Sequence, residues 1–259
     1  MDFNEFKDSA SDILNINLSG YKIKRVKRRT NSLMRRHDVD DYQECLNLLK
    51  NDPEFKAAYL NHFTINTSEF FRNPDTFEYL KNEIIPKLLN KENKINIWSA
   101  PCSNGSEPYT ISIIMHELGI DKSRYNILAS DLDKKIIKTA KNGLYGNSSL
   151  KNVPDNLLNK YFKKLPGKNK YQLNRKIMSD VDFEKKDLIN DRFQKNWHLI
   201  LSRNFFIYLT KEIKKQLTEK FISVLKDGGY FFLGNTEFLF NPGRYGLNKE
   251  YLSFYRKED

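Results

Sequence analysis

From residue 95 onward, short β-rich runs alternate with helical runs, and this alternation constrains the fold more than any other feature of the chain. The runs occupy 95–100, 107–118, 125–131, 133–142, 197–202, 211–225, 230–234 and 252–255. A helix that connects two strands returns the chain to the starting edge of the sheet, so the strands run parallel. The sequence therefore predicts an α/β fold in which helices cover both faces of a doubly wound parallel sheet.

One segment, 161–187, departs from this alternation. It contains a turn signal at Pro166 and Gly167, and Tyr171 and Leu173 follow at the spacing of a strand. Such a pattern is typical of a hairpin. We expect a small antiparallel β insertion here, inside a sheet domain that spans 95–259.

The first 63 residues show helical periodicity, which predicts an all-helical N-terminal domain. Residues 64–94 then form a linker that contains a long helix at 75–89. We expect Pro86 to bend the end of this helix, because proline lacks the N–H that a helix interior needs.

The segment 20–36 carries much of the formal net charge of +11, which is 44 Lys and Arg minus 33 Asp and Glu. On a helix, its packed face consists of Ile23, Val26, Thr30, Leu33 and Met34. Eight basic residues lie outside that face: Lys22, Lys24, Arg25, Lys27, Arg28, Arg29, Arg35 and Arg36. Two interpretations remain open, a solvated surface or a docking site for an acidic partner that uses Arg25, Arg28 and Arg29.

The composition excludes several classes of protein. No apolar run approaches the ~20 residues of a membrane span, so we expect no membrane insertion. Residues 1–10 lack the basic and then apolar pattern of a secretory signal, which predicts a cytoplasmic protein. Cys45 and Cys102 form no CxxC pair, and the four histidines show no metal-ligand spacing, so no metal site is predicted.

The strand at 95–100 leads into a loop with a single glycine, Gly105, before a helix that has Glu107 near its start. In a doubly wound sheet the ligand lies at the carboxyl ends of the strands. Glu107 would repel a pyrophosphate and suits a cationic or neutral ligand; the alternative is an acid that complements the helix dipole. Asp131 ends the next strand, where a carboxylate commonly accepts hydrogen bonds from ribose hydroxyls, whereas Asp133 is suited to cap the following helix. These residues predict a nucleoside-type cofactor.

Four motifs follow one another along the chain. The pattern N-x-[TS]-x-F-[FY]-R is matched by Asn66, Ser68, Phe70, Phe71 and Arg72. The pattern S-A-x-C-S-x-G-x-E-P-Y is matched by Ser99, Ala100, Cys102, Ser103, Gly105, Glu107, Pro108 and Tyr109. Two later patterns, A-[TS]-D-x-D and R-N-x-x-I-Y, are matched by Ala129, Ser130, Asp131, Asp133, Arg203, Asn204, Ile207 and Tyr208. In these motifs, and in its basic helix, the chain resembles the CheR family of chemotaxis-receptor glutamate O-methyltransferases over nearly its whole length.

The resemblance implies a Rossmann-like methyltransferase sheet that uses S-adenosylmethionine and releases S-adenosylhomocysteine. The methyl group would pass to glutamate side chains on the cytoplasmic helical bundle of chemotaxis receptors. The implied cofactor-binding residues are Asn66, Ser68, Arg72, Glu107, Asp131, Asp187, Leu188, Asn204 and Phe205. Asp187 stands where the family more often has Asn. A monomer that binds no nucleic acid is expected.

This reaction requires little acid–base chemistry. A glutamate side chain has a pKa near ~4.3 and is already ionised at neutral pH, so it needs no general base. The site has to align the carboxylate with the methyl group and exclude water. Arg72 and Tyr208 are the catalytic candidates for orienting the carboxylate. Alternatively, Arg72 binds the carboxylate of the cofactor itself.

Two other functions are compatible with the same fold. A nucleic-acid methyltransferase would benefit from the positive charge, but the loop at 204–207 lacks the prolines of the [DN]-P-P-[YF] pattern. A non-catalytic receptor-binding module would not need the complete set of motif residues, so their retention counts against it.

Overall fold

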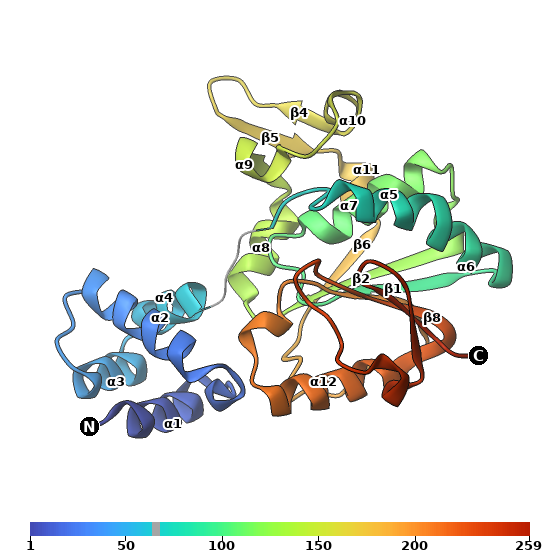
Figure 1. Cartoon of the computed structure of the whole chain (residues 1–259). Helices are drawn as coiled ribbons and strands as arrows, with labels where there is room; N and C mark the ends of the chain where they lie inside the picture. The colour runs from blue at the N-terminus through green and yellow to red at the C-terminus, as the bar shows by residue number, and fades with distance from the viewer. Residues whose placement is uncertain (64–67) are drawn as a thin grey trace.

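The computed structural model describes residues 1–63 and 68–259, and Figure 1 shows a group of N-terminal helices beside a helix-covered sheet. The N-terminal helices are α1 (Phe3–Leu14), η1 (Leu18–Gly20), α2 (Ile23–Arg36), α3 (Tyr42–Asn51) and α4 (Pro53–Phe63). Asp2 and Asp41 cap α1 and α3, since their side chains accept hydrogen bonds from amides of the first helical turn. The prediction of an all-helical N-terminal domain is confirmed.

The packed face of α2 differs from the expected one at two positions. Ile23 was expected on that face but is 50% exposed, because it opens the first turn of the helix, which points to solvent. Arg25 was expected among the exposed basic residues but is only 9% exposed. The prediction that all eight basic residues avoid the packed face is therefore wrong for Arg25, whose guanidinium lies against aromatic rings.

The helix predicted at 75–89 is a continuous helical stretch in three parts. These are α5 (Pro74–Tyr79), the π-helical turn η2 (Leu80–Ile84) and α6 (Ile85–Lys91). Pro86 cannot donate to the carbonyl four residues earlier, which accounts for the wider turn just before it.

A seven-stranded sheet forms the centre of the second domain, in the order β6-β2-β1-β7-β8-β10-β9. Its strands are β1 (Ile95–Ser99), β2 (Tyr125–Asp131), β6 (Val181–Lys185), β7 (Trp197–Ser202), β8 (Leu225–Leu233), β9 (Leu247–Tyr251) and β10 (Phe254–Lys257). β6, β2, β1, β7 and β8 pair in parallel, whereas β10 pairs antiparallel with both of its neighbours. The predicted doubly wound sheet is confirmed, and the strand order reverses between β1 and β7, which is the topological switch point of the sheet.

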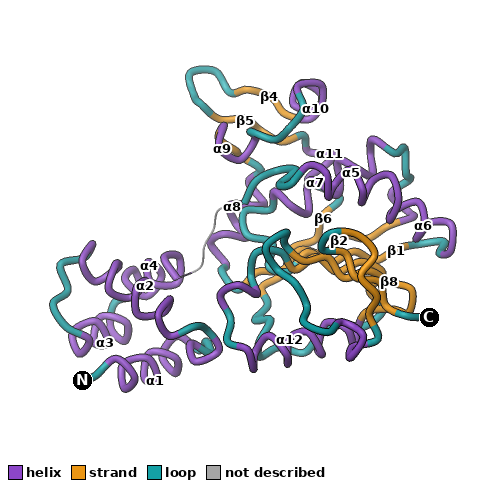
Figure 2. The backbone as a smooth tube through the Cα atoms, viewed as in Figure 1, coloured by secondary structure: helices purple, strands orange, loops and turns teal. Residues whose placement is uncertain are grey.

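Helices cover the two faces of this sheet (Figure 2). The longer ones are α7 (Ser106–Glu117), α8 (Lys134–Asn142) and α12 (Lys211–Val224). Alternate residues of β1 serve the two faces, since Trp98 packs with Phe221 of α12 while Ile97 belongs to a second core that includes α6 and α7. The first core continues into the N-terminal helices, so the two domains share buried apolar surface.

The antiparallel insertion has other boundaries than the predicted 161–187. A separate sheet with the order β3-β5-β4 contains β3 (Leu144–Gly146), β4 (Phe162–Lys164) and β5 (Lys170–Leu173). Val181–Lys185, expected in the insertion, instead pairs in parallel with β2 as strand β6 of the main sheet. The alternating apolar residues of this segment fit a strand of the small insertion and a strand of the main sheet equally well. Only its pairing with β2 shows that it belongs to the main sheet.

Short elements complete the chain. They are η3 (Lys122–Arg124), α9 (Asn147–Leu150), α10 (Asp155–Tyr161), α11 (Arg175–Met178), η4 (Phe206–Tyr208) and η5 (Pro242–Tyr245). The strand predicted at 252–255 is a hairpin of β9 and β10 whose turn contains Leu252 at φ 39°. None of the helices in the described part of the chain is long and apolar enough to cross a membrane.

Candidate active site

Two adjoining cavities lie at the carboxyl ends of β1, β2 and β7, the edge at which doubly wound sheets bind ligands. They share four lining residues: Pro101, Ser103, Asn204 and Tyr208. The loops after the three strands therefore form a continuous wall, and a ligand longer than either cavity can extend through both.

The first cavity is lined mainly by apolar groups. Its apolar lining includes Leu132, Leu188 and Phe205 from the sheet domain. Tyr21 and Phe63 of the N-terminal domain contribute two further aromatic rings, which meet edge to face with centroids 4.9 Å apart. Such walls suit a flat heterocycle.

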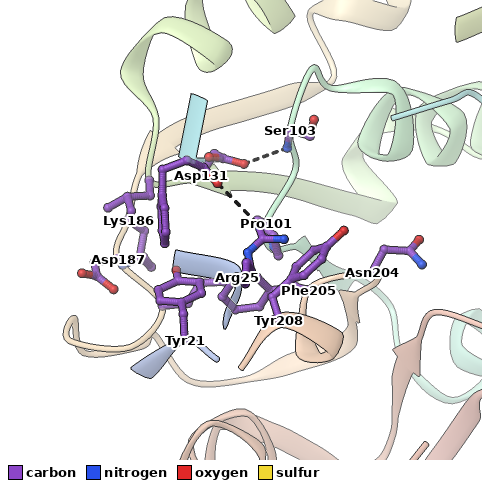
Figure 3. Close-up of a pocket in the computed structure, with 13 residues that line it drawn as sticks. Tyr21, Arg25, Pro101, Ser103, Asp131, Lys186, Asp187, Asn204, Phe205 and Tyr208 are labelled. Carbon is purple, nitrogen blue, oxygen red and sulfur yellow. Dashed lines mark hydrogen bonds between the residues drawn. The ribbon is translucent and has the colours of Figure 1, made fainter. Parts of the chain in front are cut away.

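Asp131 lies in this cavity at the end of β2, 5% exposed (Figure 3). Its Oδ2 accepts a hydrogen bond from the backbone N–H of Ser103 at 2.8 Å, and its Oδ1 accepts one from the N–H of Asp133 at 3.0 Å. Burial raises the pKa of Asp131 to about 6, and these amide donors oppose the rise. The Asp131 carboxylate is thus held in place with acceptor capacity left for a ligand.

Asp133 has the predicted helix-capping role. Its Oδ1 accepts hydrogen bonds from the amides of Lys135 and Ile136 at 2.8 and 3.4 Å, at the start of α8. This cap orients the loop that follows Asp131.

The second cavity is polar and charged. Ser68, Glu69, Arg72, Glu107 and Arg203 line it. Glu107 accepts a hydrogen bond from the Ser99 hydroxyl at 2.7 Å and pairs with Arg203 at 3.3 Å. Burial raises the pKa of Glu107, while the positive charge of Arg203 opposes this rise. The cavity therefore offers both carboxylates and guanidinium groups, which suits a zwitterionic ligand.

Arg203 is a motif residue for which the sequence predicts no role in the site, and the structure shows that it holds neighbouring segments of the site together. Its Nη2 donates to the Arg72 carbonyl at 2.7 Å and to Asn73 Oδ1 at 2.9 Å. Its guanidinium also lies over the rings of Phe77 and Phe232, at 5.0 and 4.6 Å from their centroids. Arg203 therefore fixes the segment that carries Arg72 against the sheet.

Ser68 and Arg72 are held by the first loop and by α7 as well. The Asn104 side-chain amide donates to the Ser68 carbonyl at 3.1 Å, and the Phe71 amide donates to the Thr110 hydroxyl at 3.1 Å. Asn66, the first residue of this motif, lies outside the described residues.

The remaining sequence-predicted residues also lie around the cavities. Leu188 and Phe205 line the apolar one, as does Asp187, while Asn204 lines both. The Asp187 carboxylate accepts hydrogen bonds from the Ile189 amide at 2.9 Å and the Asn190 side chain at 2.8 Å. Asp187 therefore also orders its own turn.

Tyr208 lines both cavities, and the Arg25 guanidinium lies over its ring (Figure 3). Arg25 Nη2 donates to the Phe63 carbonyl at 3.3 Å. Of the other two basic residues selected for docking, Arg28 is exposed, whereas Arg29 is half-buried and its Nε donates to the His62 carbonyl at 2.5 Å. Arg25 is thus a wall residue of the cavity, while Arg28 is a surface residue.

Sequence reasoning missed several lining residues. Tyr21, Phe63 and Lys186 line the apolar cavity without belonging to any strand-end motif. Glu237, after β8, binds the loop that contains Asn204 through backbone amides. These residues are brought to the site by tertiary packing, and no spacing in the sequence connects them with it.

The donor set fits a nucleoside with an amino-acid end, as S-adenosylmethionine is. An apolar cavity with one buried carboxylate suits an adenosine, and the adjoining charged cavity suits an ammonium and a carboxylate. Among the residues that the structure describes, no three His, Cys, Asp or Glu side chains come together as a metal site would require.

Comparisons with known proteins agree with this geometry. Residues 1–64 match the family described as "CheR methyltransferase, all-alpha domain", and residues 66–250 match "CheR methyltransferase, SAM binding domain". The chemotaxis protein methyltransferase of Listeria monocytogenes is 34% identical over 235 residues, which cover 90% of this chain and 88% of that protein. The one from Borreliella burgdorferi is 34% identical over 250 residues, covering 92% and 86%. The one from Salmonella typhimurium is 28% identical over 228 residues, covering 85% and 77%.

Proposed function

Because the chain belongs to the CheR methyltransferase family, whose S-adenosylmethionine-binding domain it carries, we propose that it methylates glutamate side chains of a chemotaxis receptor. The product would be a glutamate methyl ester. Methylation in chemotaxis with S-adenosylmethionine as cofactor follows from the family. The observation that carries the finer proposal is the position of Tyr208, with Arg25 against it, where an apolar and a charged cavity adjoin.

We assign the cofactor to the two cavities together. Its adenine would lie against Leu132, Leu188 and Phe205, and its ribose hydroxyls would donate to Asp131. Its amino-acid end would reach the charged cavity, where Arg72 and Ser68 would hold the carboxylate and Glu107 would face the ammonium. Asn204 borders both parts and would hold the cofactor near its sulfur. When bound, the cofactor supplies a methyl group made electrophilic by the sulfonium charge.

The substrate carboxylate would then be oriented by Tyr208 and Arg25. Tyr208 has a hydroxyl that can donate to one carboxylate oxygen, which leaves the other oxygen free to attack. Arg25 supplies positive charge beside that hydroxyl and attracts an anionic side chain to the cavity mouth. Arg72 is assigned to the cofactor instead, since it shares the charged cavity with Glu107 and Arg203.

No residue has to remove a proton. The glutamate is ionised at neutral pH and attacks as an anion, so the protein contributes orientation and exclusion of water. The rings of Tyr21, Phe63 and Phe205 line the apolar cavity and would help to remove water from the nucleophile as substrate enters.

Receptor docking would use the exposed part of the basic helix α2, with Arg28 as its central residue and Arg29 at its edge. The methylated region of a receptor is rich in glutamate, and opposite charges accelerate encounter. The receptor partner and the site residues named above are parts of the proposal.

Radiolabelled S-adenosylmethionine tests the proposal directly. The protein is incubated with membranes that contain chemotaxis receptors, and the labelled product is treated with mild base. Carboxyl methyl esters release volatile methanol, as we expect. Label that stays on a nucleic acid or an amine after base treatment would identify a different methyltransferase.

A further inference from the structure

Glu237 has no place in the chemistry proposed above, although it is buried next to the site. The residue lies in the loop after β8 and is 6% exposed. No cation among the described residues forms an ion pair with it. A buried carboxylate is costly unless its oxygens are hydrogen-bonded, so its partners indicate what it does.

Those partners are three backbone amides. Glu237 Oε2 accepts from the amide of Asn204 at 2.6 Å and from the amide of Gly234 at 2.8 Å. Glu237 Oε1 accepts from the amide of Ile207 at 3.1 Å. Both oxygens are thus occupied by main-chain donors, and two of the three donors belong to the loop that connects β7 to α12.

This loop needs such support. Asn204 has a left-handed backbone with φ 58°, which is unfavourable for a residue that has a Cβ. Ile207 lies in η4, whose last residue is Tyr208. By binding the amides of Asn204 and Ile207 together, Glu237 fixes the backbone that leads directly into Tyr208.

Gly234 shows how closely these groups approach. A Cβ at Gly234 would lie 2.7 Å from Glu237 Oε2, 2.8 Å from Asn204 Nδ2 and 3.0 Å from the Asn204 amide nitrogen. Any side chain there would separate Glu237 from Asn204.

We infer that Glu237 is a positioning residue, which holds Asn204 and Tyr208 toward the two cavities and thereby controls cofactor affinity and turnover. The inference rests on the proposed roles of Asn204 and Tyr208. Burial lowers the pKa values of Arg203 and Lys214, and the nearby charge of Glu237 partly opposes this lowering.

Glu237→Gln separates this role from simple filling of space. Glutamine has the same shape but only one acceptor oxygen, so its NH₂ group must face either the Ile207 amide or the amides of Asn204 and Gly234. An unsatisfied buried amide should release the loop and weaken binding of S-adenosylhomocysteine about ten-fold. Glu219→Gln, on the exposed face of α12, is the matched control and should bind as the wild type does.

Double-mutant cycles decide whether Glu237 acts through its neighbours. We measure the dissociation constant of S-adenosylhomocysteine by calorimetry for Glu237→Gln, Asn204→Ala and the double variant, with thermal unfolding as the stability readout. In the Asn204→Ala background, Glu237→Gln should weaken S-adenosylhomocysteine binding less than two-fold. In a second cycle, Glu237→Gln should reduce kcat for methylation in the wild-type background but hardly at all in the Tyr208→Phe background.

If Glu237→Gln lowered affinity and kcat equally in the wild type and in the Asn204 or Tyr208 variants, or lowered neither, Glu237 would contribute to stability alone. If Glu237→Gln fails to fold, Gly234→Ala is measured in the same cycles and must give the same pattern. The binding cycle uses no receptor, so a protein that passes it but does not methylate receptors would contradict the proposed function and leave the positioning role intact.

Discussion

The Arg25 guanidinium carbon lies 3.5 Å from the centre of the Tyr208 ring, so a residue of the helical domain is in contact with the candidate catalytic tyrosine of the sheet domain. Burial lowers the pKa of Arg25, and the neighbouring Tyr208 opposes that effect. Among the described residues, no hydrogen-bond acceptor reaches Arg25 Nε or Nη1. Both nitrogens are covered by protein atoms, so Arg25 acts on an anion in the cavity through its charge.

Arg25→Met should lower kcat for methylation about 100-fold, the loss expected when a reacting group is misplaced by about 1 Å. Methionine preserves most of the packing of the side-chain stem, so cofactor affinity should change little. Steady-state kinetics and calorimetry on one preparation give both values. Arg28→Met, at an exposed position of the same helix, is the control, and equal losses of kcat in the two variants would refute a specific role for Arg25.

Tyr208→Phe should reduce kcat at least ten-fold and leave the dissociation constant of S-adenosylmethionine within two-fold of the wild type. The substitution removes one hydroxyl and almost no packing. If kcat and cofactor affinity fell together, Tyr208 would be a cofactor-binding or structural residue.

The exposed basic residues of α2 can be tested without disturbing the cavity. Arg25 and Arg29 are unsuitable for charge reversal, because both donate hydrogen bonds to carbonyls of α4. Lys24 and Arg28 are exposed. Lys24→Glu combined with Arg28→Glu should raise KM for the receptor at low salt and leave cofactor binding unchanged. The difference in KM between this variant and the wild type should become smaller at 1 M salt, where the electrostatic screening length is only ~3 Å. An unchanged KM would mean that these cations are merely solvated.

Cofactor affinity should depend on pH through Asp131. Its pKa of about 6 lies above the ordinary value of 3.8, so the carboxyl retains a proton below pH 6. Ribose hydroxyls donate hydrogen bonds and therefore favour the ionised form, so binding has to expel that proton. Affinity should rise with pH from 5, where it is about ten-fold weaker, and level off above 7. Calorimetry on Asp131→Asn should show a flat profile. If Asp131→Asn kept the pH dependence of the wild type, another group would be responsible for it. Glu107 would be the next candidate, because burial also raises its pKa.

Arg203→Met should lower the free energy of unfolding by about 3 kcal/mol or more, because it leaves Glu107 buried without its counter-charge. The pKa of Glu107 should rise further in this variant, so the loss of stability should be larger at pH 8 than at pH 5. Adding Glu107→Gln should restore much of the stability but not the activity, since this variant lacks both the carboxylate assigned to the cofactor's ammonium and the Arg203 donor to the Arg72 carbonyl. Urea unfolding together with methylation assays checks this, and complete recovery of activity would contradict it.

The strand-end residues of the site were predictable from the sequence for a physical reason. Asp131 and Asn204 each follow a run of buried strand residues, and the carboxyl ends of parallel strands necessarily meet at one edge. Local pattern and final position therefore agree, and the same holds for Asp133 as a helix cap.

Other residues could not be predicted because local pattern and final position disagree. Arg25 has a charge and a helical phase that both indicate solvent, yet the apposed domain buries it against Tyr208. Val181–Lys185 carries an alternation that fits an insertion hairpin, and only its pairing with β2 makes it part of the main sheet. Glu237 reaches Asn204 across 33 residues through main-chain amides, which leave no trace in side-chain spacing.

Tyr21, Arg25 and Phe63 come from the helical domain and complete the apolar cavity of the sheet domain. A ligand in that cavity contacts both domains at once. Its binding free energy therefore also stabilises the contact between the two domains. At a ligand concentration of about 100 times the dissociation constant, this linkage amounts to roughly 2.7 kcal/mol. If S-adenosylmethionine occupies this cavity as proposed, its concentration would set how firmly the helical domain is attached to the sheet domain.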